Sequence, residues 1–466
     1  MSMATRPVAG PGRPWEFPAV HHATLANGLR VSVAPMHRLP MVTVLAMVDA
    51  GATRDAAGHE GASLLTASAL TEGTARLDGA SLTEQCERLG ASIDAGADWD
   101  SFMAHVAVTP DRLEQAMALF GEVLITPGFR ARDVERLKEE RLADLLQQRV
   151  EPRGLAAEQF REFLYVDGSR YRVSAGGSPA TVRGLTPEIV QAFHAAHVAP
   201  SRMTIVLTGD VTPERGVELV ERALGSWRGG DAASRVIPAT VDDRTVAGGR
   251  RVRVVHKADA PQSELRVGHR GLPRLHPDFF DVVVMNALLG GLFSSRINLN
   301  LREKHAYTYG ANSMFDWRRG AGPFVVSTAV KTEVTDAAVR EILLEIDRMR
   351  SETVSADELS LATAYLDGVF PIRYETTTAV AQAIATASSY GLPDDYYTTY
   401  RERVRGVTAE SVRRAAEQHL HPEELLVLAV GDREAIRAPL DALGIGPLDV
   451  VVPADEPAEE PTEDAG

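Results

Sequence analysis

The most regular arrangement of apolar and polar residues in this chain occurs twice. In the first copy, residues 183–188 have the sequence Arg-Gly-Leu-Thr-Pro-Glu and begin an amphipathic helical pattern that ends near His197 and Pro200. An apolar run at residues 203–207 follows, and Gly209-Asp210 closes it. A threonine before a helical period, followed by a short apolar run, predicts a capped helix that leads into a buried strand.

The second copy begins 222 residues further along the chain. Residues 405–410 have the sequence Arg-Gly-Val-Thr-Ala-Glu, and the correspondence continues without a gap. His419 therefore matches the histidine of the first copy, Pro422 matches its proline, and Gly431-Asp432 matches its Gly-Asp pair. A repeat of this length indicates a duplicated supersecondary arrangement.

A second, looser pair of patterns supports the duplication. Residues 100–108 and 322–330 alternate between apolar and polar positions, which predicts one strand in each copy. Each strand precedes a helix-turn-helix pattern, at residues 109–148 and 335–370. The chain is therefore expected to be an α+β protein with two related halves, which form two lobes able to enclose a ligand.

Composition divides the chain further. The start is rich in Pro, Gly and Arg, which predicts a flexible N-terminal segment at residues 1–17, and the Gly-, Asp- and Ala-rich residues 229–249 predict a linker. The C-terminal end mixes Asp, Glu, Pro and Ala, so residues 451–466 are expected to form an acidic, disordered tail. The two halves then span residues 18–228 and 250–450.

The net charge and the hydropathy of the chain exclude some classes of function. A net charge of −15 argues against nucleic-acid binding, which needs a basic face. No run approaches the roughly 20 apolar residues of a membrane span, and no secretory signal peptide is visible. We therefore expect a cytoplasmic protein, although the acid-poor start leaves a transit peptide open.

The single cysteine, Cys86, excludes a disulfide within the chain. It lies in an amphipathic helical pattern at residues 82–89. This favours a buried, inert thiol over a nucleophile.

Two neighbouring segments of the second half carry a known signature. Residues 289–296 have the sequence Leu-Gly-Gly-Leu-Phe-Ser-Ser-Arg, and residues 301–310 have the sequence Leu-Arg-Glu-Lys-His-Ala-Tyr-Thr-Tyr-Gly. They resemble the Gly-Gly-x-x-Ser-Ser-Arg-Leu and Leu-Arg-Glu-x-x-x-x-x-Tyr motifs of the pitrilysin/insulinase-type (M16) zinc metallopeptidases, with Ile297 replacing the Leu. The resemblance covers nearly the whole chain from residue 22. It implies a clamshell of two homologous halves, each built from antiparallel sheet and helices.

The resemblance also places the family's zinc site in the first half, as His-x-x-Glu-His before the Gly-Thr at residues 73–74. Aligned without gaps, the two His positions become Leu64 and Ser68, and the Glu position becomes Ala67. The third ligand falls on Asp144. Leu and Ala cannot coordinate a metal ion and Ser is a poor zinc ligand, so no metal cofactor is expected in this chain.

Other histidines offer weaker possibilities. His59 and Glu60 lack a second histidine at position 63, which is serine, and adjacent glycines favour a solvated loop. His194 and His197 lie one turn apart, but the end of a helix favours structural roles for both. The remaining histidines show no convincing ligand spacing.

Two functional positions of the family are matched in the second half, by Arg302 and Tyr309. A guanidinium and a phenol are suitable donors for the negative charge that develops on a scissile carbonyl. The alternative is that Arg302 pairs with Glu303 and that Tyr309 is an ordinary strand residue. The family also binds peptides by adding them to a sheet edge, and residues 91–97 are the corresponding edge here.

The resemblance therefore implies a zinc-less partner subunit of a heterodimeric M16B-type metallopeptidase. A homologous chain with His-x-x-Glu-His would supply zinc and the general base, and an unfolded peptide would be the substrate. The lack of a long glycine-rich loop favours a bacterial-type partner over the mitochondrial one. The alternative is a structural or peptide-binding subunit without a role in catalysis. No nucleophile–base constellation, phosphate loop or Cys/His cluster supports an autonomous enzyme.

Overall fold

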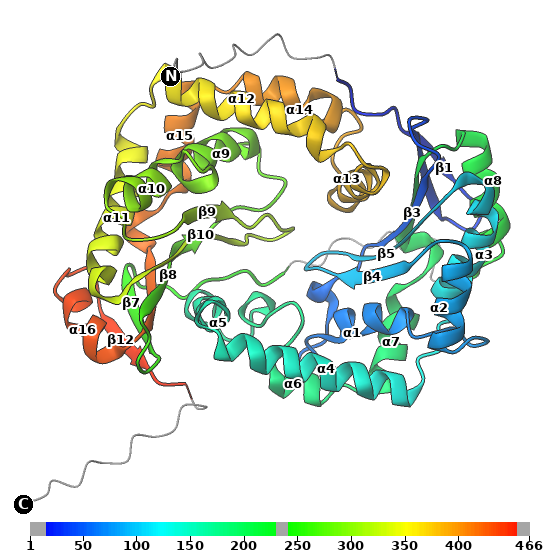
Figure 1. Ribbon diagram of the computed structural model, residues 1–466, viewed down its shortest axis with the longest axis horizontal. Coiled ribbons are helices and arrows are strands. Elements are labelled where there is room, and N and C mark those ends of the chain that lie inside the picture. Colours follow the sequence, from blue (N-terminus) through cyan, green and yellow to red (C-terminus); the bar gives the residue numbers. More distant parts are fainter. Residues whose placement is uncertain (1–14, 230–240, 454–466) are drawn as a thin grey trace, which may run out of the picture.

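The computed structural model describes residues 15–229 and 241–453 and contains two six-stranded sheets with helices around them (Figure 1). The first half has the strands β1 His21–Thr24, β2 Arg30–Pro35, β3 Val42–Val48, β4 Ile93–Ala97, β5 Phe102–Val108 and β6 Met203–Gly209. Its helices are α1 Ala62–Leu70, α2 Gly79–Arg88, α3 Leu113–Ile125, α4 Ala131–Val150, α5 Pro152–Leu164, α6 Pro179–Arg183, α7 Pro187–His197 and α8 Pro213–Leu224.

The second half has the strands β7 Arg251–His256, β8 Gln262–Arg270, β9 Ala311–Phe315, β10 Pro323–Lys331, β11 Leu426–Gly431 and β12 Leu448–Val451. Its helices are α9 Phe279–Asn286, α10 Arg296–Asn298, α11 Thr335–Ser351, α12 Ala356–Arg373, α13 Thr377–Tyr390, α14 Tyr396–Arg405, α15 Ala409–His419 and α16 Arg433–Asp441. Two π-helical turns follow α9 and α10, at Ala287–Gly291 and Leu299–Lys304. Single 3₁₀ turns lie at Ala52–Arg54, Pro110–Arg112, Arg170–Arg172, Pro200–Arg202, Thr332–Val334 and Pro422–Glu424.

The two sheets confirm the duplication. Their strand orders are β1-β2-β6-β3-β5-β4 and β12-β7-β11-β8-β10-β9, so five of the six strands correspond in order. In both halves a threonine caps the predicted helix: Thr186 accepts a hydrogen bond from the backbone of Ile189, and Thr408 accepts one from Ser411. The outer strands differ, because β1 runs antiparallel to β2 whereas β12 runs parallel to β7. The α+β class and the two homologous halves are therefore confirmed.

One helix of each half packs on the sheet of the other half. Helix α5 of the first half packs on β8 and β11, and helix α13 of the second half packs on β3 and β6 (Figure 1). Strand β11 shows why its apolar run is continuous. Leu426, Leu428 and Val430 pack in a cluster with α5, whereas Val427 and Ala429 face the helices of their own half. Both faces of each sheet are thus covered, and neither half closes its core alone.

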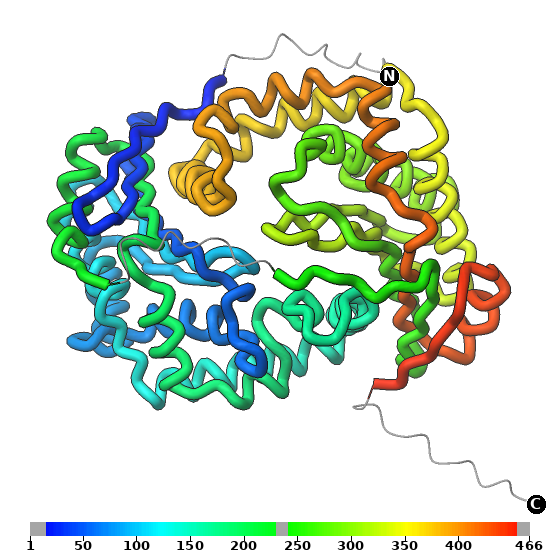
Figure 2. Tube along the Cα trace, turned by 180° about the vertical axis from the view of Figure 1, so that it is seen from behind, coloured from blue at the N-terminus to red at the C-terminus, as the bar shows by residue number. Residues whose placement is uncertain are grey.

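The predicted linker and N-terminal segment lie only partly in the described residues. Residues 241–249 are tied to the first half through a bridge between Tyr165 and Thr245. At Trp15 and Phe17 the structure differs from the flexible segment that the composition predicts. Phe17 is buried and stacks on Tyr397 of the second half, so aromatic packing orders this end of the segment (Figure 2, dark blue beside orange).

The loop between β9 and β10 also joins the halves. The Arg319 backbone amide donates to Asp100 at 2.8 Å, and its guanidinium lies 2.7 Å from Asp49. Tyr390 of α13 donates to the same Asp100 carboxylate. These three contacts hold the second half directly against the first.

The stretch Phe279–Lys304 contains α9, α10 and the two π-helical turns, with a non-helical break at residues 292–295, and is long and apolar enough to cross a membrane by length and composition alone. However, 56% of its apolar window is buried inside the protein, as in a core helix.

Candidate functional site

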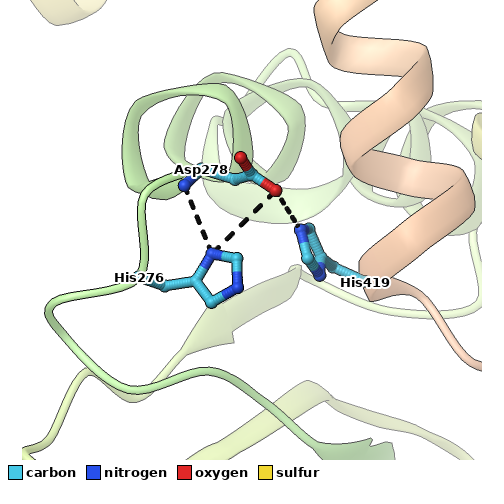
Figure 3. A group of neighbouring side chains, drawn as sticks. All are labelled: His276, Asp278 and His419. Atoms are coloured by element: carbon cyan, nitrogen blue, oxygen red, sulfur yellow. Dashed lines mark hydrogen bonds and ion pairs between the residues drawn. The ribbon is translucent and has the colours of Figure 1, made fainter.

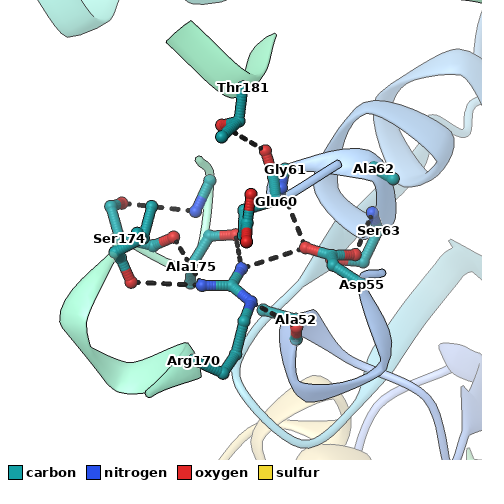
Figure 4. Close-up of polar contacts among 12 residues, drawn as sticks. Ala52, Asp55, Glu60, Gly61, Ala62, Ser63, Arg170, Ser174, Ala175 and Thr181 are labelled. Atoms are coloured by element: carbon teal, nitrogen blue, oxygen red, sulfur yellow. Dashed lines mark hydrogen bonds and ion pairs between the residues drawn. The ribbon is translucent and has the colours of Figure 1, made fainter. Parts of the chain in front are cut away.

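The helix that carries the family's metal-ligand positions is held in place by a buried ion pair. Asp55 accepts hydrogen bonds from the backbone amides of Gly61 and Ser63, both at 2.8 Å, at the beginning of α1 (Figure 4). The Arg170 guanidinium lies 3.0 Å from the same carboxylate and also donates to the carbonyl of Ala52. Burial raises the pKa of Asp55, and Arg170 and the two amides oppose this effect.

The side chains at the positions that correspond to the family's zinc site do not form a metal site here. Ala67 is fully buried in α1, Leu64 and Ser68 are half-buried, and Asp144 is exposed on α4. Arg141, one turn before Asp144, donates to the carbonyl of Gly176. A methyl group added at Gly176 would contact both the Arg141 guanidinium and the Leu64 side chain, so a cation lies beside the first ligand position.

The donor set therefore does not fit zinc at these positions. One exposed carboxylate and one hydroxyl remain, and an arginine adds a positive charge that repels a divalent cation.

The glycine-rich part of the second-half signature is structural. Gly290 lies directly against β9. A Cβ atom added at this glycine would lie 2.7 Å from the backbone nitrogen of Ser313. Asn286 donates to the Ser313 carbonyl and accepts from its hydroxyl, which fixes the same strand. The missing side chain at Gly290 thus lets the first π-helical turn pack closely on β9.

The arginine of the Ser-Ser-Arg motif is also structural. Arg296 forms two hydrogen bonds with Glu358 of α12, at 2.9 and 3.2 Å. These bonds hold the pKa of Glu358 at about 2. Asn298 donates to the carbonyl of Phe293 and accepts from the amide of Ala311, and so connects the two ends of the signature.

Arg302 and Tyr309 differ from these buried contacts because they face outward. The Arg302 side chain is 38% exposed, and Tyr309 is 91% exposed. Arg302 lies 3.3 Å from Glu303, as the alternative interpretation predicts, but its guanidinium also lies 4.5 Å from the ring centre of Phe293. Phe293 is itself 66% exposed, and sequence reasoning gave it no role. A stacked guanidinium keeps its N–H groups in the plane available to a ligand.

The expected peptide-binding edge is an edge strand in the structure. β4 pairs only with β5, and its outer side carries no partner among the described strands. It packs against α1. The first-half edge and the Arg302–Tyr309 segment belong to different halves. The latter begins within the second π-helical turn and ends just before β9.

The remaining predicted positions have structural contacts. His194 contacts the carbonyl of Leu124, and His197 contacts Arg202, with its pKa lowered to about 4 by burial. His59 lies in a loop, and burial raises the pKa of the Cys86 thiol. The structure adds one cluster that the spacing of histidines did not reveal, formed by His276, Asp278 and His419.

Comparisons with known proteins agree with this fold. Residues 32–165 match the family model described as insulinase (peptidase family M16), and residues 184–366 match the model described as peptidase M16 inactive domain. A crystal structure from Pseudomonas fluorescens, described as a peptidase M16 inactive domain, has a TM-score of 0.81 at 24% identity and covers 89% of this chain and 98% of its own. A protease structure from Helicobacter pylori has a TM-score of 0.82 at 17% identity, over 89% of this chain and 99% of its own.

The relatives of this chain have names that describe different functions. The probable mitochondrial-processing peptidase subunit beta of Arabidopsis thaliana is 22% identical over 426 residues, covering 89% of this chain and 78% of its own length. An uncharacterised zinc protease of Streptomyces coelicolor is 21% identical, with 90% and 91% covered. A non-peptidase homologue of Helicobacter pylori is 22% identical, with 85% and 90% covered.

Proposed function

This chain belongs to the insulinase family (peptidase M16), and we propose that it is the zinc-less partner subunit of a two-chain M16B-type metallopeptidase. A homologous subunit with His-x-x-Glu-His supplies the metal and the general base. This chain contributes Arg302 and Tyr309, which bind an unfolded peptide and stabilise its scissile carbonyl. The chain has no peptidase activity alone.

One observation carries the proposal. The signature segment is built from buried contacts at Gly290, Arg296 and Asn298, yet it leaves Arg302 and Tyr309 exposed. In the other half, Leu64 and Ser68 stand at the two histidine positions and Ala67 at the position of the general base. A rigid support with outward-facing donors is the arrangement that charge stabilisation requires.

The two side chains have complementary tasks. The Arg302 guanidinium offers N–H groups from a fixed plane, and stacking on Phe293 limits its rotation. Tyr309 adds a hydroxyl donor without a buried partner to displace. Both groups can orient a peptide before reaction, which lowers the entropic cost of the reaction.

The relatives support a partner of the same family. One is named as a subunit of mitochondrial-processing peptidase, and others are named as bacterial zinc proteases. The short glycine motif favours the bacterial type of assembly, and a cytoplasmic location belongs to the same proposal.

The first test measures cleavage of a quenched fluorescent, unstructured peptide. The chain is assayed alone, mixed with a His-x-x-Glu-His homologue from the same organism, and compared with that homologue alone. We expect cleavage only in the mixture, together with a heterodimer in size-exclusion chromatography. Equal activity of the homologue with and without this chain would refute the proposal.

The second test assigns the residues. Arg302→Ala and Tyr309→Phe should each lower kcat/KM of the mixture about 10²- to 10³-fold, because each removes one donor to the developing charge. The heterodimer should remain intact.

The controls are an arginine and a tyrosine that lie elsewhere on the surface. Arg132 and Tyr365 are 72% and 54% exposed, against 38% for Arg302 and 91% for Tyr309. Arg132 is exposed and lies 3.3 Å from its neighbour Asp133, as Arg302 does from Glu303. Tyr365 is an exposed tyrosine of α12. Arg132→Ala and Tyr365→Phe should leave kcat/KM within twofold. Full activity of the Arg302 and Tyr309 variants would exclude the assigned roles.

The second candidate is a structural or peptide-binding subunit without a catalytic role. The match to a non-peptidase homologue favours it. It predicts that the heterodimer forms and that the Arg302 and Tyr309 variants lose neither assembly nor activity.

A further inference from the structure

Three potential metal ligands meet between α9 and α15, on the second half of the molecule. His276 and Asp278 lie in the loop that leads into α9, and His419 is the last residue of α15 (Figure 3). Their ligand atoms all lie within 4.8 Å of one another. The sequence does not predict this meeting, because 141 residues separate Asp278 from His419.

The separations suit one small divalent ion. Four-coordinate zinc with bonds of about 2.0–2.2 Å to nitrogen and oxygen places its ligand atoms about 3.3 Å apart. The Nε2 atom of His419 lies 2.7 Å from Oδ2 of Asp278, and Nδ1 of His276 lies 3.9 Å from the same oxygen. These two distances bracket the required value. Binding through Nδ1 of His276 also replaces the hydrogen bond that this atom accepts from the Asp278 backbone amide at 3.2 Å.

The backbone that carries the three residues is firmly held. α9 and α15 pack closely along their lengths, and Ser411 of α15 donates a hydrogen bond to Asp281 of α9. The imidazole rings of His276 and His419 already contact each other, with centroids 4.8 Å apart. A site whose ligands adjoin the packed ends of two helices needs little ordering when the ion binds.

Exposure leaves access for the ion and for water. His419 is mostly buried, whereas His276 and Asp278 are 26% and 35% exposed. The two partly exposed ligands leave one side of the cluster accessible to solvent. Two imidazoles and one carboxylate are a donor set that zinc commonly accepts, with water in the fourth position.

We propose that His276, Asp278 and His419 form a binding site for a single divalent transition-metal ion of the zinc class. The ion joins the beginning of α9 to the end of α15. It replaces the direct contact between Nε2 of His419 and the Asp278 carboxylate. This site lies in the other half from Leu64 and Ser68 and contributes nothing to peptide cleavage.

The test uses the full chain stripped of metal with a chelator. Titration with Co²⁺ should give one equivalent bound, with visible absorption bands typical of a nitrogen- and oxygen-ligated ion, and Zn²⁺ should displace them. His276→Ala should weaken Zn²⁺ binding at least tenfold while leaving the Asp278–His419 bond and the fold intact. His419→Gln, which keeps a polar side chain, should do the same.

The control is a histidine–carboxylate pair without a second histidine. His37 lies 2.6 Å from Asp210, and both are exposed. His37→Ala should leave Zn²⁺ affinity unchanged. Binding that survives His276→Ala and His419→Gln, or the absence of a saturable equivalent in the parent chain, would overturn the proposal.

The test of this metal site can succeed or fail independently of the test of the proposed function. His276→Ala should leave peptide cleavage by the heterodimer unchanged. Zinc found in the isolated chain belongs to this site if His276→Ala removes it. Zinc that persists in that variant would instead indicate ligands elsewhere.

Discussion

A single methyl group at Gly290 tests how the signature segment is supported. An added Cβ would lie 2.7 Å from the Ser313 backbone nitrogen, closer than atoms in proteins normally approach. Gly290→Ala should therefore destabilise the protein by about 1–3 kcal/mol, measured by urea unfolding. Gly368 of α12 is the control, since nothing lies within 4 Å of its added Cβ. Gly368→Ala should instead stabilise by about 0.5–1 kcal/mol. Equal effects would contradict the close packing.

His269 predicts how stability depends on pH. Nδ1 of its ring contacts the carbonyl of Arg270, Nε2 accepts from the backbone of His421, and burial lowers its pKa to about 4. In the unfolded chain this histidine binds a proton near pH 6.5, so a falling pH stabilises the unfolded state relative to the folded state. The contribution of His269 to the free energy of unfolding is therefore complete above pH 6.5 and is lost between pH 6.5 and 4, by about 2 kcal/mol at pH 5.

The measurement compares urea unfolding at pH 7.5, 6 and 5. His269→Gln should lose less stability than the parent over this range. The exposed His21 is the control, and His21→Gln should follow the parent curve. Parallel curves for all three proteins would rule out His269 as a source of the pH dependence.

At single residues, the family motif shows which side chains to test but not what surrounds them. Arg302 and Tyr309 could be selected as candidates from that motif, and their role stays a prediction. The ring of Phe293 beneath Arg302 could not, because stacking depends on how the π-helical turn folds back. The same holds for His419, whose partners lie on a different helix.

At the scale of elements, local patterns predicted the helices and strands that repeat. The threonine caps of α7 and α15 and the strand pairs β5/β10 and β6/β11 follow from short-range signals, whereas the edge at β4 was expected from the resemblance to the family. The π-helical turns do not; the first of them lies where Gly290 contacts β9, a contact that no local pattern specifies. The sheet partners of α5 and α13 are likewise decided by tertiary packing, since an amphipathic pattern does not specify which sheet a helix covers.

Phe160 on α5 tests this exchange of helices. Its side chain is buried in the cluster formed with β11 of the other half. Phe160→Ala should cost about 3–5 kcal/mol in urea unfolding. Leu361, an exposed residue of α12, is the control, and Leu361→Ala should change stability by less than about 0.5 kcal/mol. A small effect of Phe160→Ala would show that α5 is not required on that sheet.

At the scale of the whole molecule, the halves form one folding unit. Without the first half, the second would expose Val255, Leu426, Leu428 and Val430, which α5 covers. Burying such side chains contributes about 1.5–3 kcal/mol each, which together is comparable with the total stability of a domain.

Residues 250–453 expressed alone should therefore lack a cooperative thermal transition and should bind a hydrophobic dye. The full chain should show one transition by circular dichroism and by tryptophan fluorescence. A cooperatively folded, dye-silent half would contradict the shared core. The internal repeat predicted two halves correctly, but similar sequence could not show that each completes the other.

The ion pair of Asp55 and Arg170 has an evolutionary consequence. Small domains organised by zinc unfold when the metal is lost, so their ligands cannot drift. Here α1 begins on the Asp55 carboxylate and is fixed by Arg170, without any contribution from a metal. Ligand side chains at positions 64 and 68 are therefore not needed to begin the helix, because Asp55 and Arg170 hold it instead. A gene copy freed from metal chemistry could lose its ligands stepwise and still encode a sound subunit.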